Sequence, residues 1–558
     1  MENKTSNSDS ESDHVMVGDI FNKDIESISH KCDVDKDELF DEETCLTSNL
    51  NKVDNLQSEI SIENPISWSG YHSSSLTSNV VPTISSILPL FKDVAHTEAM
   101  MKHSMEVIQD AVKYLNPGQV PVITCDQPLY ALCRLIQEKY PHLGPDKYFV
   151  MMGGLHIEMV VLKILGELLS GSGWVHTLSE ARVLTEGRAD ACLKASHIAR
   201  SRYVHEVTSA TIYILQSESY QKYLSNTCSD EKPSSFEEWK QNQGKSSPQF
   251  YFRDLILELK LPLLCYVRSL RESNFQLFKD TLNKLVPWMF SLDHTNYARY
   301  LPVFIRDLRE LETQHPELHQ MFDKGHFTVK KSERKFSAIA LDQGHEQNNK
   351  CIKEDGGVIG LTECPEALLR WMVGGPEVSR VIREFEEARE HRTVKIFDNH
   401  HNATISFSKS FVQDVINLKT VFEDLGSPFE ETSSDLISLE TKDVVSEKGI
   451  ENLRKLKSVG EEQFNTYCKE RLVNMTSSLH EKIPKNNLRI FEEKGRYQTS
   501  KVRQQLSTLR NDCNIFSQML ISCQTRKGDL DEFFSHENME YPPSLSNNGD
   551  FNTGSKVT

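Results

Sequence analysis

Tyr148–Met159 reads YFVMMGGLHIEM, and this stretch decides the fold that the chain is expected to adopt. A short apolar run stops at two glycines, and a helical pattern begins at once with His156 and Glu158 in its first turn. Tyr148–Met152 is therefore predicted to be a buried strand, and His156–Leu169 the helix that follows it. The glycines suit a tight backbone turn between the two. Such a junction can direct polar side chains at one point.

A second strand lies upstream. Val120–Asp126 reads VPVITCD and is followed by the helical stretch LYALCRLIQEKY. Two short apolar strands that each lead into a helix predict a parallel α/β sheet. Ligands of such sheets gather outside the carboxyl ends of the strands, so Asp126 is a candidate metal ligand. It is equally a candidate cap for the helix that begins beside it, and both interpretations stay open.

The rest of the chain has a helical pattern, so the predicted fold is mostly helical: a small α/β core with a large all-α insertion and an α-helical C-terminal region. Within it we expect a surface loop at Ser225–Gln249, a short strand or hairpin at Lys324–Gln343, and helices at 343–353 and 364–392. The predicted parts are an acidic disordered tail (1–85), the first part of the core (86–178), the helical insertion (179–325), the second part of the core with helices (326–440), a helical hairpin of 447–483 and 487–521 (441–525) and a tail (526–558).

Composition narrows the class of protein. The formal net charge is −18, but residues 1–75 carry 17 Asp/Glu against five Lys, so the body is only mildly acidic and a broad grip on nucleic acid is not expected. Twelve cysteines without metal or disulfide spacing predict an intracellular protein, nuclear or cytoplasmic. Neither a secretory signal nor an apolar run of membrane-spanning length is present in the sequence, which predicts no membrane partner.

Carboxylates are the candidate catalytic groups. Glu158 is in register with apolar positions, where it must be paired, bound to a metal, or satisfied by first-turn amides. Asp342 and Glu346 lie four residues apart and share a face if their helix starts early. Converging carboxylates hold Mg²⁺ or Mn²⁺, which can activate water in phosphodiester chemistry. His156 and His345 are the candidate supporting side chains.

A basic cluster follows helical spacing between Lys194 and His205, and Arg188 lies one loop earlier. These side chains could contact the phosphates of a nucleic acid, or they could form a solvated helix face with ordinary ion pairs. The candidate residues are Arg188, Lys194, His197, Arg200 and Arg202.

Several segments together resemble a known family. GGLHIEM, LDHTNYARYLPVFIRDL and LDQGHEQNNKCIKEDGG are similar to an uncharacterised set of invertebrate proteins associated with transposable elements. The block Asn296–Gly357 also resembles domains grouped with ribonuclease H-like (DDE-type) transposases. The resemblance spans roughly residues 90–545 and implies a ribonuclease H-like core.

The resemblance also implies roles for the carboxylates. Transposases of this type place one Asp at a strand end, a second acid after another strand and a Glu on a helix, with a helical insertion before the last. Asp126 would be the first, Glu346 the last and residues 170–325 the insertion. At the middle position GGLHIE offers glycine, so either Glu158 replaces the acid or the metal site is broken. Asp342 is a further candidate ligand.

Two hypotheses follow. The first is a transposon-derived protein, ancestrally for metal-dependent cleavage and transfer of DNA strands, with the chain a truncated form of longer relatives. It predicts that Asp126, Glu158 and Glu346 lie within a few ångströms around Mg²⁺ or Mn²⁺. The second is a catalytically dead helical scaffold that binds protein or nucleic acid, or forms a homo-oligomer. A metabolic enzyme finds no support, because the sequence has no dinucleotide, P-loop, nucleophile-elbow or zinc motif.

Overall fold

The computed structural model describes residues 67–76, 82–83, 94, 96–227, 233, 235–332, 334–354, 402, 404–429 and 435–491, isolated residues between 366 and 385, and the backbone of two short strands near the C-terminus. Contacts within the chain divide it into two units, Met1–Glu492 and Glu493–Thr558. The first unit contains both expected parts of the α/β core together with the helical insertion between them.

Two parallel strands lie where the sequence predicts them. β1 (Val122–Cys125) pairs in parallel with β2 (Phe149–Met152), with Val122 opposite Phe149 and Cys125 opposite Met152. β1 leads into α5 (Gln127–Lys139) and β2 into α6 (Gly154–Leu169). β2 is buried along its whole length, which explains its continuous apolar sequence. Among the described residues no sheet has more than two strands, and the structure is mostly helical, as expected.

The other described helices form the body around this pair. They are, in chain order, α3 (Trp68–Ser75), α4 (Glu98–Leu115), η3 (Pro141–Leu143), α7 (Trp174–Glu180), α8 (Glu186–Leu193), α9 (Ile198–Asn226), α10 (Phe236–Ser246), α11 (Pro248–Glu272), α12 (Phe275–Ser291), α13 (Thr295–Gln314), α14 (Pro316–Asp323), α15 (Leu341–Glu354), α17 (Ile405–Asp424), α18 (Glu447–Tyr467) and η6 (Cys468–Val473).

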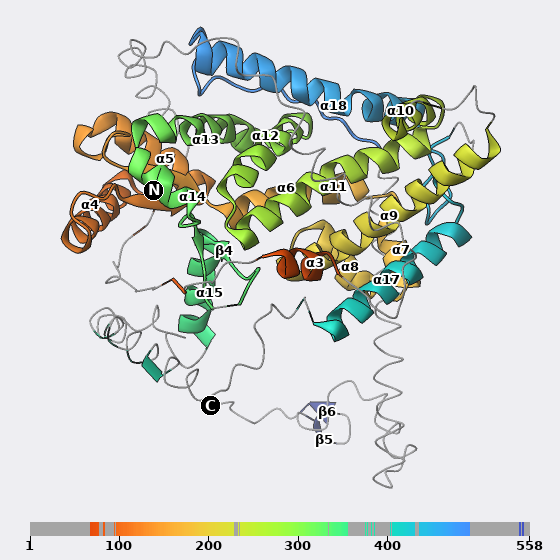
Figure 1. Cartoon of the computed structure of the whole chain (residues 1–558), viewed down its shortest axis with the longest axis horizontal. Coiled ribbons are helices and arrows are strands. Elements are labelled where there is room, and N and C mark those ends of the chain that lie inside the picture. Colours follow the sequence, from red (N-terminus) through yellow and green to blue (C-terminus); the bar gives the residue numbers. More distant parts are fainter. Residues whose placement is uncertain are drawn as a thin grey trace. The chain divides into compact units, whose positions relative to one another are not determined.

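Helix α11 lies at the centre of the body and packs against α6, α9, α10 and α12 (Figure 1). It begins where the Ser247 hydroxyl accepts a hydrogen bond from the Phe250 amide at 3.2 Å, a standard N-terminal cap. Most of its residues are buried, and each fully buried large apolar side chain stabilises the fold by roughly 1.5–3 kcal/mol. The position of this helix joins the α/β junction at α6 to the rest of the body.

Close helix packing fixes the C-terminal part of the body. α18 lies across α12 (Figure 1), and a Cβ atom at Gly460 would come within 2.4 Å of the Pro287 carbonyl oxygen. The Ser291 hydroxyl donates across the same contact to the Leu456 carbonyl at 2.8 Å. Glycine at position 460 is therefore required by the direct backbone contact between the two helices.

Three predicted elements differ from the structure. α3 forms inside the predicted disordered tail, because Ser67 caps it and its Trp68 ring packs edge-on against Phe336 at 5.9 Å. α10 forms inside the predicted surface loop, where Trp239 is almost fully buried. The predicted helix 447–483 is too long, since α18 ends at Tyr467 and, after η6, the chain is no longer helical.

Of the short strand or hairpin predicted at Lys324–Gln343, the structure shows the hairpin: β3 (Thr328–Val329) pairs antiparallel with β4 (Ile339–Ala340). The second unit contains one described feature, the small antiparallel pair of β5 (Ser546–Asn547) and β6 (Asp550–Phe551), inside the predicted tail. Most of the predicted helix at 364–392, residues 492–521 and most of the acidic tail lie outside the described residues. None of the described helices combines the length and apolar character needed to cross a membrane.

Candidate functional site

The start of α6 is capped by a side chain from far along the sequence. Its N-cap residue is Gly153, which has no side chain to cap with. Asp342, at the start of α15, takes this role: its Oδ1 accepts from the Leu155 amide at 3.0 Å and its Oδ2 from the His156 amide at 3.2 Å. A carboxylate is favoured there, since the free amides and the helix dipole both attract negative charge.

Gly153 makes room for this carboxylate. A Cβ atom at position 153 would lie 2.3 Å from Asp342 Oδ2 and 3.2 Å from the Cys125 carbonyl oxygen, so any larger residue would displace one of them. The Gly153 amide also donates to that carbonyl at 2.7 Å, which continues the pairing of β1 and β2. Gly153 thus lies beside an acid that α15 supplies.

His156, in the first turn of α6, is influenced by several acidic groups. Its Nδ1 lies 2.9 Å from Asp342 Oδ2, and its side chain is 31% exposed. The hydrogen bond to Asp342 is the largest cause of its change in pKa and raises it, while burial opposes the rise. The charges of Asp342, Asp126 and Glu346 raise the pKa of His156 further. We call Asp342, Asp126 and Glu346 the acidic edge, because the charge of each contributes to the pKa of His156.

Asp126 acts as a helix cap. Its Oδ1 accepts from the Leu129 amide at 3.1 Å, so the capping interpretation is confirmed. Its charge also acts on Tyr297 of α13, a residue that sequence reasoning missed. Burial raises the pKa of Tyr297 to about 12, and the charges of Asp126 and Asp342 contribute. Asp126, after the end of β1, and Asp342, at the start of α15, thus both influence the same tyrosine of α13.

Glu158 does not join these groups, which corrects the expected convergence. Its carboxylate is fully buried and bound in a two-pronged ion pair by Arg202 of α9, with Nε–Oε1 and Nη2–Oε2 both at 2.5 Å. Its place on the apolar face of α6 directs it at α9, and the arginine supplies the charge that burial requires. Glu158 is therefore a structural residue of the body.

Asp342 and Glu346 share a face of α15, because the helix starts at Leu341 as that prediction required. Asp342 is buried, whereas His345 and Glu346 are exposed. Within the acidic edge, Glu346 is thus exposed, Asp126 half-buried and Asp342 buried.

The basic cluster does not form one surface. Arg202 points into the body toward Glu158, and Lys194 pairs with Asp190 at 2.9 Å on an exposed face. Arg188 and His197 are exposed, and Arg200 is half-buried. The exposed members remain available to phosphates, but without Arg202.

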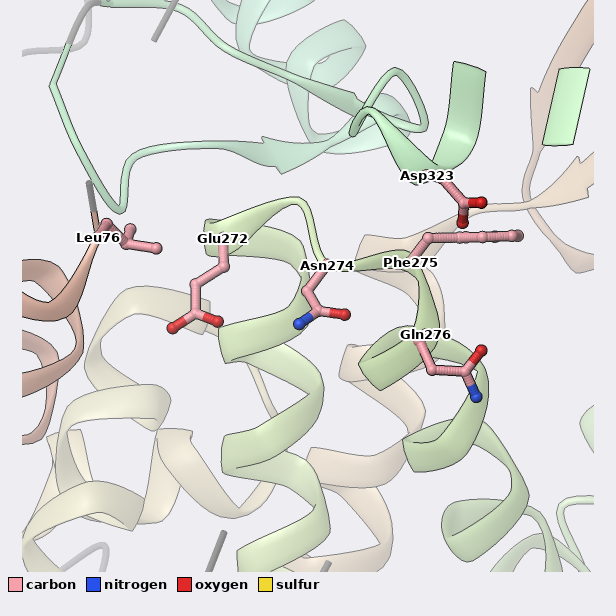
Figure 2. A pocket seen from close by; sticks show the side chains of 6 residues that line it. All are labelled: Leu76, Glu272, Asn274, Phe275, Gln276 and Asp323. Carbon is pink, nitrogen blue, oxygen red and sulfur yellow. The ribbon is translucent and has the colours of Figure 1, made fainter. Parts of the chain in front are cut away.

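A separate hollow of about 430 Å³ lies where α3, α11, α12 and α14 meet (Figure 2). It contains none of the predicted site residues. Its lining residues are Leu76, Glu272, Asn274, Phe275, Gln276 and Asp323.

The donor chemistry of the acidic edge fits a hard divalent cation, because carboxylate oxygens are the ligands that Mg²⁺ and Mn²⁺ prefer. Within the described residues, no three His, Cys, Asp or Glu side chains already stand together as a metal site. Asp342 uses both oxygens in hydrogen bonds, and Asp126 uses one. The second oxygen of Asp126 and the carboxylate of Glu346 are the oxygens of the acidic edge that these hydrogen bonds leave unused.

The fold and this edge define a mostly helical protein with a two-stranded parallel α/β junction that carries carboxylates at its carboxyl end. The family model described as "Domain of unknown function (DUF8702)" matches residues 67–245 and 255–537, so the chain belongs to that family. No match was found among curated proteins or solved structures.

Proposed function

We propose that this chain is a transposon-derived protein with a ribonuclease H-like ancestry, and that its acidic edge binds Mg²⁺ or Mn²⁺ for the cleavage and transfer of DNA strands. The proposal is supported by the contact of His156 with Asp342 at 2.9 Å beside the β1–β2 pair. The charges of Asp126 and Glu346, which are 220 positions apart in the sequence, contribute to the raised pKa of the same histidine. Carboxylates at the carboxyl end of parallel strands are well placed for such a site.

The residues of the acidic edge have different roles in this proposal. Asp126 and Glu346 hold the cation, while Asp342 keeps the amides of α6 and the His156 ring in position. A bound divalent ion would supply an activated water and stabilise the leaving oxygen of a phosphodiester. The exposed basic residues Arg188 and Lys194 would contact DNA phosphates.

Calorimetry with Mn²⁺ and nicking of supercoiled plasmid DNA test this function on the full chain. The expected result is Mn²⁺ binding and Mn²⁺-dependent nicking, both reduced at least tenfold by Glu346→Gln. Asp126→Asn should have the same effect without unfolding the protein, because asparagine is as good a helix cap as aspartate. Glu317→Gln, at an exposed position of α14, is the matched control.

A second candidate is a catalytically inactive scaffold that binds protein or nucleic acid or self-associates. The observation that favours it is the structural use of two expected metal ligands: Glu158 is bound by Arg202, and Asp342 caps α6. A flat Mn²⁺ titration and no nicking, with normal unfolding, would contradict the first function and favour the scaffold. Sedimentation equilibrium would then show whether it self-associates.

A further inference from the structure

Three basic side chains lie deep in the helical body. Arg253 and Lys260 of α11 are fully buried, and His205 of α9 is 1% exposed. No residue in the described part of the chain forms a hydrogen bond with Arg253 Nε, Nη1 or Nη2, with Lys260 Nζ, or with either ring nitrogen of His205. We call these three side chains the basic triad.

Two members of the triad, His205 and Lys260, lie against Trp174 of α7. The His205 ring stacks on Trp174 with centroids 5.2 Å apart and an angle of 9°, and Lys260 Nζ lies 5.3 Å from the centre of the Trp174 ring. Arg253 lies seven residues before Lys260, two turns along the same helix face, or about 10 Å of rise. The Arg253 guanidinium lies 5.4 Å from the Phe422 ring of α17.

The three groups act on one another electrostatically. Burial holds the pKa of Lys260 well below its usual value, and the charge of Arg253 lowers it further. Burial likewise lowers the pKa of His205, and Lys260 adds to that effect. For Arg253, burial alone lowers the pKa, to about 10. Among the described residues, no acid opposes these three shifts.

Two largely buried arginines elsewhere in the described residues, Arg202 and Arg134, are each paired with a carboxylate. Arg202 binds Glu158, and Arg134 lies 3.0 Å from Asp307. A basic side chain that is buried without a counter-charge is unfavourable in its charged form, and a bound anion would remove this penalty for all three members of the triad.

We propose that the basic triad binds an oxyanion of the phosphate class, enclosed among α7, α9, α11 and α17. The guanidinium fork of Arg253 matches two phosphate oxygens, while Lys260 supplies a point charge and His205 a ring N–H. The source is free orthophosphate or a phosphorylated small molecule such as a pyrophosphate or a polyphosphorylated polyol. This site is independent of the acidic edge and of the function proposed for it.

The direct test is a phosphorus assay of the full chain. The purified protein is dialysed against phosphate-free buffer and denatured, and the released phosphorus is measured per mole of chain. Expected is at least one mole of phosphorus, or, if the anion is lost on dialysis, a rise in Tm on adding inorganic phosphate, pyrophosphate or inositol hexakisphosphate. The anion that gives the largest rise in Tm distinguishes a site for free phosphate from a site for a polyphosphate. Sodium chloride at equal ionic strength should not reproduce the rise.

Substitutions distinguish an anion site from buried basic residues without an anion, because the two predict opposite changes in Tm in phosphate buffer. With an anion bound, Lys260→Met and Arg253→Met each abolish the Tm rise and lower Tm in phosphate buffer. Without one, each methionine removes a buried charge and raises Tm in every buffer. Lys163→Met, at an exposed position of α6, is the control and should retain the full phosphate response. A raised Tm of the methionine variants, with no phosphorus in the parent and no response to phosphate, would overturn the proposal. If Arg253→Met does not fold, Lys260→Met and the phosphorus assay still decide the question.

Discussion

The ion pair between Glu158 and Arg202 allows a quantitative test of the body's packing. The Glu158 side chain is fully buried and that of Arg202 only 12% exposed, and two 2.5 Å contacts join them. Arg202→Met would leave a carboxyl group in an apolar interior without its cation. Breaking a buried pair in this way typically costs about 3–5 kcal/mol of unfolding free energy.

The size of the effect can be worked out independently. A carboxyl group that cannot stay ionised must take up a proton. For an ordinary glutamate at pH 7 this costs about 1.36 kcal/mol for each of roughly 2.7 pH units, or about 3.7 kcal/mol. The same arithmetic predicts that the deficit shrinks by about 2.7 kcal/mol between pH 7 and pH 5, because protonation becomes easier. Stability of the variant relative to the parent is therefore lost as pH rises.

Urea unfolding followed by tryptophan fluorescence at pH 5 and pH 7 measures both the loss of unfolding free energy in Arg202→Met and the change of that loss with pH. The comparison is best made in a Glu206→Gln background, because Glu206 also senses Arg202. Glu158→Leu with Arg202→Met should recover most of the loss, since an apolar pair of similar volume replaces the ions. Lys194→Met, at an exposed ion pair, should change stability by less than about 0.5 kcal/mol. A loss under 1 kcal/mol for Arg202→Met, or one that does not vary with pH, would refute this reasoning.

Two further predictions concern single positions. Gly153→Ala should lower the unfolding free energy by about 1–3 kcal/mol in urea, because its Cβ would meet the Asp342 carboxylate. Its control is Gly187→Ala on α8, which has open space around it and should raise the unfolding free energy by up to about 1 kcal/mol. Equal effects of the two substitutions would contradict the contact assigned to Gly153. Burial raises the pKa of Glu206 to about 7 against the opposing charges of Arg271 and Arg202, so its contribution to stability is full below pH 4.5 and lost as pH rises through 7. Glu206→Gln should therefore become more stable than the parent between pH 5 and pH 8, by on the order of 3 kcal/mol, and parallel pH profiles would contradict it.

Local features of the fold could be predicted from the sequence. The apolar run before Gly153 marks β2, and Asp126 caps α5 because a capping side chain acts only three residues away. α10 could also have been recognised, since Ser235 and Glu238 have the spacing of a capping box ahead of Trp239. Periodicity and capping are both short-range, and these elements depend on little else.

The partners across the fold could not be predicted. Glu158 on its apolar face indicates only that some cation must approach, and Arg202 is one of many that could. Asp342 is 187 positions from the amide it caps, a separation that no periodic pattern describes. The one available signal for the basic triad was a pair of cations, Arg253 and Lys260, on one face of a largely apolar helix.

The long-range cap of α6 affects how the protein is made. A ribosome that adds about 5–20 residues each second needs roughly 10–40 s to travel from Leu155 to Asp342. During that interval α6 can form and present its apolar face, but its first amides have no hydrogen-bond acceptor from Asp342. We therefore expect α6 to stay exposed to chaperones until α15 leaves the exit tunnel, so that a messenger ending before β4 would yield a product cleared by proteolysis.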